Sequence, residues 1–126
     1  LAFAKCSLCS GIGTVLEILN FDRLLEGVDL VISGEGRLDG QSSQGKVLDG
    51  IGEACKKKNI PVVALVGGIG DGASQIYSCG VRSAMSSVNN IMTAQEAFSR
   101  AEELFLDAAD RMCRFIKVGM ELKKEG

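Results

Sequence analysis

Residues able to do chemistry are concentrated in one stretch of the sequence, Gly34–Lys46. Its carboxylates can bind Mg²⁺ or accept a hydroxyl proton, and its arginine can hold a carboxylate or phosphate through two parallel hydrogen bonds. An ordinary turn needs glycines and a helix cap but not these charged groups, so the stretch predicts a functional loop. The alternative is that the charged side chains are solvated or paired with one another while a serine caps the next helix. The side chains concerned are Glu35, Arg37, Asp39, Gln41, Ser42, Ser43, Gln44 and Lys46.

Part of this stretch nearly matches a phosphate-binding P-loop, with Gly40, Gly45 and Lys46 at the G-x-x-x-x-G-K positions. Val47 stands where a serine or threonine hydroxyl must bind Mg²⁺, so the sequence disfavours a true P-loop. The match still indicates a helix start near Lys46 that suits an anion, because the first backbone N–H groups of a helix are unpaired.

Two further loops are candidates for ligand contacts. Gly67–Gly72 contains four glycines and Asp71, which can cap the next helix or contact a metal or a ribose. These glycines lack the G-x-G-x-x-G spacing of a dinucleotide-binding loop. Val88–Met92 contains two neighbouring asparagines, and we interpret it as a turn because asparagine is common in turns.

The spacing of apolar residues predicts the elements that position these loops. Amphipathic patterns predict four helices: Gly11–Gly27 with a break near Asn20, Lys46–Lys58, Gly72–Cys79 and Thr93–Gly119. Short apolar or β-branched runs predict three strands: Val28–Ser33, Val62–Val66 and Ser83–Ser87. The alternating order predicts an α/β fold with a parallel sheet and helices on both faces.

The last predicted helix has the clearest start signal. Thr93 and Glu96 form a capping box, in which the Thr93 hydroxyl accepts a hydrogen bond from the Glu96 backbone N–H. The apolar stripe that follows predicts that Phe98, Phe105 and Phe115 pack in the core.

In a parallel sheet, ligands bind beyond the carboxyl ends of the strands, here at the loops beginning at Gly34, Gly67 and Ser87. Three strands make a narrow sheet for a doubly wound fold. Either parts absent from this chain cover the sheet, or two copies of the chain form a homodimer.

Composition excludes several classes of protein. The sequence has 14 Lys and Arg against 16 Asp and Glu, which gives no general attraction to nucleic acid or to anionic membranes. Without histidine, the chain cannot complete a Ser-His-Asp triad, a Cys-His dyad or a Cys/His zinc site. No run approaches the roughly 18 apolar residues of a membrane span. Five cysteines without paired spacing favour a reducing, cytoplasmic location.

A longer string, Asp29–Ser42 followed by Gly45 and Lys46, resembles the signature stretch of the bacterial type I glycerate kinases. The resemblance continues through Pro61–Gly67, Gly70–Gly72 and the final helix. It implies a kinase that transfers the γ-phosphoryl group of ATP to D-glycerate, with the 2-position favoured, in a cleft between two α/β domains.

The same resemblance implies that residues 1–126 are the carboxyl-terminal portion of a Rossmann/flavodoxin-like three-layer domain with a parallel sheet. This portion is incomplete, begins at Leu1 rather than Met, and is expected to be inactive alone because a cleft needs two walls. The competing hypothesis is a non-catalytic flavodoxin-like module that binds an anion or a nucleotide.

The resemblance also assigns roles to residues at matching positions. The implied catalytic residues are Asp39, Arg37, Lys46 and Glu35. The implied substrate- or phosphate-binding residues are Gly34, Gly36, Gln41, Ser42, Gly45, Gly67 and Asp71. Asp39 or Glu35 is expected to bind Mg²⁺, and the expected small-molecule ligands are glycerate and ATP.

Overall fold

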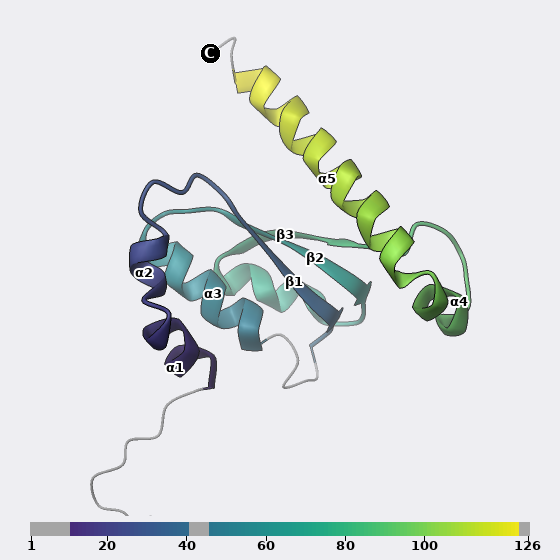
Figure 1. Ribbon diagram of the computed structural model, residues 1–126, viewed down its shortest axis with the longest axis horizontal. Helices are drawn as coiled ribbons and strands as arrows, with labels where there is room; N and C mark the ends of the chain where they lie inside the picture. Colours follow the sequence, from purple (N-terminus) through teal and green to yellow (C-terminus); the bar gives the residue numbers. More distant parts are fainter. Residues whose placement is uncertain (1–10, 41–45, 124–126) are drawn as a thin grey trace, which may run out of the picture.

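A parallel sheet of three strands in the order β1-β2-β3 forms the centre of the computed structural model, which describes residues 11–40 and 46–123 (Figure 1). The strands are β1 Val31–Leu38, β2 Val62–Ile69 and β3 Val81–Ser86. The helices are α1 Gly11–Ile18, α2 Phe21–Leu24, α3 Lys46–Lys57, the 3₁₀ helix η1 Ala73–Cys79, α4 Ala94–Ser99 and α5 Ala101–Lys123. This alternation of helices with parallel strands confirms the predicted α/β fold.

Asn20 separates α1 from α2, at the place where the sequence predicted a break. Its φ of 51° lies in the left-handed region, which asparagine tolerates better than most residues. The Asn20 carbonyl then accepts hydrogen bonds from Arg23 and Leu24, which begins the next helical turn.

β1 lies further along the chain than predicted. The expected strand was Val28–Ser33, but β1 continues far enough to contain Glu35 and Arg37, which we had placed in a loop. Both residues pair with β2 in the parallel register. Glycines permit this pairing, because a Cβ on Gly67 would collide with the carbonyl oxygen of Gly36.

Different helices cover the two faces of the sheet (Figure 1). α3 and η1 lie on one face and α5 lies on the other. Along β2, Val62, Ala64 and Val66 are buried on the α3 side, whereas Leu65 is buried on the α5 side. Both faces of β2 are therefore covered, as its unbroken apolar sequence indicated.

The predicted helix Thr93–Gly119 is two helices, α4 and α5, separated at Arg100. The Thr93 hydroxyl accepts a hydrogen bond from the Glu96 backbone N–H at 3.2 Å, which confirms that part of the capping box. No helix among the described residues, α5 included, combines the length and apolar composition needed to cross a membrane.

The predicted burial of the three phenylalanines on this segment is wrong. Phe98, Phe105 and Phe115 are 82%, 49% and 70% exposed, whereas Leu104, Ala108 and Met112 are buried. The physical reason is position on the helices. Phe98 lies on the separate short helix α4, and on α5 the buried stripe is Leu104, Ala108 and Met112, with Ile116 packed beside it. Phe105 and Phe115 each lie one position away from a residue of that stripe. An apolar stripe on a helix is buried only where a partner lies against it.

Candidate active site

A cleft of about 770 Å³ opens where β1 and β2 end. It lies beyond the carboxyl ends of parallel strands, the place where open α/β sheets bind their ligands. β1 and β2 form one wall, and the segment from Ser87 to Ala101 forms the other. The lining residues are Glu35, Gly36, Arg37, Gly67, Gly68, Ser87, Val88, Met92, Thr93, Ala94, Ala97, Phe98 and Ala101.

The charged side chains of the cleft come from β1. Arg37 Nε donates a hydrogen bond to Asp39 Oδ2 at 3.1 Å, with the Arg37 side chain 64% exposed and that of Asp39 18% exposed. Glu35 Oε1 accepts a hydrogen bond from the backbone N–H of Gly36 at 3.3 Å. Gly70 leaves room for the ion pair, because a Cβ there would lie 3.0 Å from Arg37 Nη2 and from Asp39 Cβ. Strand and loop together thus present two carboxylates and one guanidinium at this edge.

This donor set fits Mg²⁺ when a nucleotide supplies further oxygens. Mg²⁺ in phosphoryl-transfer sites is usually held by one or two carboxylates, several waters and the phosphates of the substrate. Glu35 and Asp39 are such carboxylates. Among the described residues, no group of three or more acidic or cysteine side chains could hold a metal ion without help from a bound nucleotide.

Backbone hydrogen bonds join the two loops that follow β1 and β2. Gly40 N–H donates to the Asp71 carbonyl at 2.8 Å, and Gly70 N–H donates to the Leu38 carbonyl at 2.7 Å. Asp71 does not cap η1, because the N-cap residue is Gly72. The φ of Gly72, 78°, lies in the left-handed region that favours glycine. Asp71 therefore contributes a backbone contact, and its side chain is exposed.

The remaining predicted site residues do not gather at the cleft. Lys46 is the exposed first residue of α3, and among the described residues it does not line the cleft; nor do Asp39 and Asp71. Gly34 lies within β1, where a Cβ would approach the Leu65 carbonyl oxygen to 3.3 Å. Three predicted ligand-binding residues lie outside the described part of the chain: Gln41, Ser42 and Gly45.

The opposite wall of the cleft was not predicted as part of the site. We had interpreted Val88–Met92 as a turn, and Phe98 as a core residue, yet Val88, Met92 and Phe98 line the cleft. One signal pointed to this wall: the capping box at Thr93 marks a helix that starts just after the third strand ends, at the same sheet edge.

Most of the chain is similar to proteins named as glycerate kinases. A model of the "Glycerate kinase family" matches residues 1–117. A glycerate kinase of Halalkalibacterium halodurans is 37% identical over 86% of this chain and 29% of its own length. The glycerate 2-kinase of Escherichia coli is 33% identical over 95% of this chain and 32% of its own. The crystal structure of a Salmonella typhimurium LT2 protein designated glycerate kinase 2 matches 95% of this chain and 30% of its own, with 31% identity and a TM-score of 0.71.

Proposed function

Because the chain belongs to the glycerate kinase family, we propose that it forms one wall of the active site of a kinase that phosphorylates D-glycerate with ATP. The chain spans about a third or less of the length of these relatives. The proposed activity is therefore that of a full-length protein in which this chain would form one part. The observation that carries the proposal is the placement of Glu35 and Arg37 in one cleft at the carboxyl edge of the sheet. The Escherichia coli relative is named a glycerate 2-kinase, which supports phosphorylation of the 2-hydroxyl to give 2-phosphoglycerate.

Arg37 is proposed to hold the carboxylate of glycerate or the negative charge that develops on the transferred phosphoryl group. Its Nε is engaged by Asp39, which fixes the plane of the guanidinium, and both Nη groups are further donors. An arginine oriented in this way positions an anion without having to reorganise during the reaction.

Glu35 is proposed to accept the proton of the reacting hydroxyl, with Asp39 orienting Arg37. The hydroxyl oxygen forms a bond to the γ-phosphorus while the bond from that phosphorus to the bridging oxygen of ADP breaks, and the proton passes to the carboxylate. Mg²⁺, held by Glu35 or Asp39 together with the phosphates, would neutralise the charge on the transferred group. A carboxylate, an arginine and a metal suffice for this chemistry, so the absence of histidine is compatible with it.

The apolar wall of the cleft supports a nucleotide as the second ligand. Val88, Met92 and Phe98 lie there, and such side chains suit the base of ATP better than glycerate, which carries a carboxylate and two hydroxyls.

The test is steady-state kinetics of glycerate phosphorylation by the full-length protein with Arg37→Ala and Asp39→Asn. We expect Arg37→Ala to lower kcat/KM by at least about a hundredfold, since it removes a charge that stabilises the transition state. The matched controls are Arg114→Ala and Asp110→Asn, because Arg114 and Asp110 form a similar ion pair on α5 at 2.8 Å. A kcat/KM within about twofold of wild type for both Arg37→Ala and Asp39→Asn would refute the assignments. Binding of ATP without turnover by the full-length protein would instead favour the non-catalytic module.

A further inference from the structure

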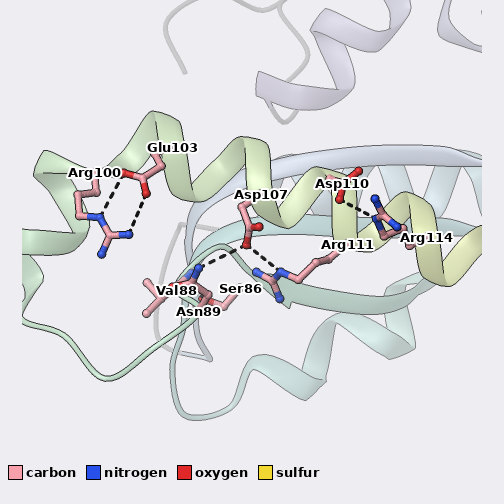
Figure 2. Close-up of polar contacts among 9 residues, drawn as sticks. All are labelled: Ser86, Val88, Asn89, Arg100, Glu103, Asp107, Asp110, Arg111 and Arg114. Carbon is pink, nitrogen blue, oxygen red and sulfur yellow. Dashed lines mark hydrogen bonds and ion pairs between the residues drawn. The ribbon is translucent and has the colours of Figure 1, made fainter.

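The segment after β3 is tied to α5 by a polar network (Figure 2). Asp107 Oδ2 accepts a hydrogen bond from Asn89 Nδ2 at 3.3 Å and another from Arg111 Nε at 3.0 Å. Asn89 belongs to the segment and the other two residues belong to α5. One carboxylate oxygen therefore joins a loop to a helix that is distant from it in sequence.

Strand β2 also holds this loop, through hydrogen bonds to its backbone carbonyls. Ser87 N–H donates to the Val66 carbonyl at 2.8 Å. The Ser86 hydroxyl donates to the Gly67 carbonyl at 3.4 Å and accepts from Val88 N–H at 3.2 Å. The loop is thus fixed to β2 at its beginning and to α5 at Asn89.

The residues between these two attachments line the candidate cleft. Ser87 is only 7% exposed, and both Ser87 and Val88 form part of the wall that faces Glu35 and Arg37. A shift of Asn89 would therefore move the wall itself, although Asn89 does not line the cleft among the described residues.

The other ion pairs that the described residues form along α5 and at Arg100 just before it make no such connection. Asp110 with Arg114, and Arg100 with Glu103, join neighbouring turns of the helical segment and are exposed. Arg111 differs, because its Nη2 atom is buried without a hydrogen-bond partner among the described residues. Among the described ion pairs of α5, that of Arg111 with Asp107 is the one that also binds a loop residue, Asn89.

We propose that Asp107 is a positioning residue of the cleft, which holds Asn89 and thereby fixes the wall formed by Ser87 and Val88. The inference rests on the proposed function, because it assigns that wall to the site of a kinase. The hydrogen bond from Arg111 and, second, that from Asn89 hold the pKa of Asp107 below its ordinary value, so the carboxylate is charged at neutral pH.

The first test is hydrogen exchange of the backbone amides of residues 86–92 in the full-length protein. Asp107→Ala is expected to speed exchange of these amides about tenfold, because the loop loses its attachment to α5. Asp110→Ala removes an equivalent aspartate–arginine pair from the same helix, and we expect it to leave these amides at the wild-type rate. Asn89→Ala should reproduce the effect of Asp107→Ala, and combining the two should add nothing further. Equal loop exchange in the Asp107 and Asp110 variants, or additive effects of Asn89→Ala and Asp107→Ala, would overturn the proposal.

The second test separates positioning from general destabilisation. Val88 belongs to the apolar wall that is proposed to contact ATP, so Asp107→Ala should raise the KM for ATP about three- to tenfold and leave kcat within about twofold. Asp110→Ala should leave both unchanged. Faster loop exchange with an unaltered KM, or a loss confined to kcat, would show that the loop is anchored but does not position the ligand, which overturns the proposal. Wild-type protein that does not phosphorylate glycerate would refute the proposed function and with it the kinase role of the wall, while the exchange measurements would still decide whether Asp107 fixes the loop.

Discussion

The two faces of the sheet differ in how completely the described residues cover them. On the α3 side, nine buried residues form one cluster, in which Leu48 and Cys55 have no exposed surface. On the α5 side the buried cluster has three residues, and large apolar side chains of α5, such as Phe105 and Phe115, remain about half or more exposed. The α3 side therefore supplies most of the apolar burial, which is the main favourable term in folding.

The less covered side is also the side that contributes the second wall of the candidate cleft. α4 and the start of α5 line it, and the polar contacts of Asp107 hold the loop between β3 and α4. The difference suggests a division between a face that stabilises the fold and a face that carries ligand contacts. We expect the rest of a longer kinase, or a second copy of the chain, to cover the exposed apolar side chains of α5.

Truncating one apolar side chain on each face tests whether the α3 side contributes more to stability than the α5 side, and this test has the largest expected effect. Leu48→Ala should lower the free energy of unfolding of the 126-residue chain by about 2–5 kcal/mol, because it leaves a cavity in a filled core. Phe115→Ala should change it by less than about 0.5 kcal/mol, because the side chain is 70% exposed. Urea denaturation measures both. A loss for Phe115→Ala as large as that for Leu48→Ala would show that something covers this phenylalanine and that the two faces are alike.

The sequence predicted the α3 side better than the α5 side for a physical reason. Val62–Val66 is apolar throughout, short and rich in valine, which favours a strand covered on both faces. On α5 the apolar residues cover more of the helix than the part that faces the sheet, so periodicity alone does not separate the buried ones from their exposed neighbours. Ile116 packs against the buried cluster, whereas Phe115, one residue before it, is 70% exposed.

The candidate site could be predicted only in part, because it combines two walls that are far apart in sequence. Glu35 and Arg37 were recognisable from their charge at the end of an apolar run. Val88 and Phe98 carry no chemical signal of their own, and they belong to the cleft only because β3 lies beside β2. The roles of Lys46 and Asp71 stay predictions, since neither lines the described cleft.

A smaller effect on stability is expected when one glycine in α3 and one in α5 are each replaced by alanine. A Cβ on Gly52 of α3 would lie 2.5 Å from the carbonyl oxygen of Cys79, whereas a Cβ on Gly119 of α5 meets nothing within 4 Å. Gly52→Ala should therefore destabilise the chain by about 1–3 kcal/mol, because backbone must move to admit it. Gly119→Ala should stabilise it by about 0.5–1 kcal/mol, the usual gain for alanine in an exposed helix. Equal effects in thermal denaturation would mean that α3 packs no more tightly than α5.

The smallest expected effect is the dependence on pH of the stability that Asp107 contributes. It distinguishes the polar attachment on α5 from the apolar packing on α3. Hydrogen bonds from Arg111 and then Asn89 lower the pKa of Asp107 below its ordinary value in the folded chain. A folded-state pKa below the unfolded value gives a stabilising contribution that is present above the unfolded pKa and is lost as pH falls through the folded one.

The difference in Tm between wild type and Asp107→Asn should therefore be constant from about pH 8 to pH 5 and shrink below about pH 4. The loss caused by Leu48→Ala should stay constant over the whole range, because no ionisable group is removed. Added salt should reduce the Asp107 effect and leave the Leu48 effect in place, since the ion pair is partly exposed to solvent. If the Asp107→Asn difference persisted unchanged at pH 3, the hydrogen bonds that join α5 to the cleft wall would not depend on the charge of Asp107. The claim that α5 is attached through a charged side chain, whereas α3 is held by apolar packing, would then be wrong.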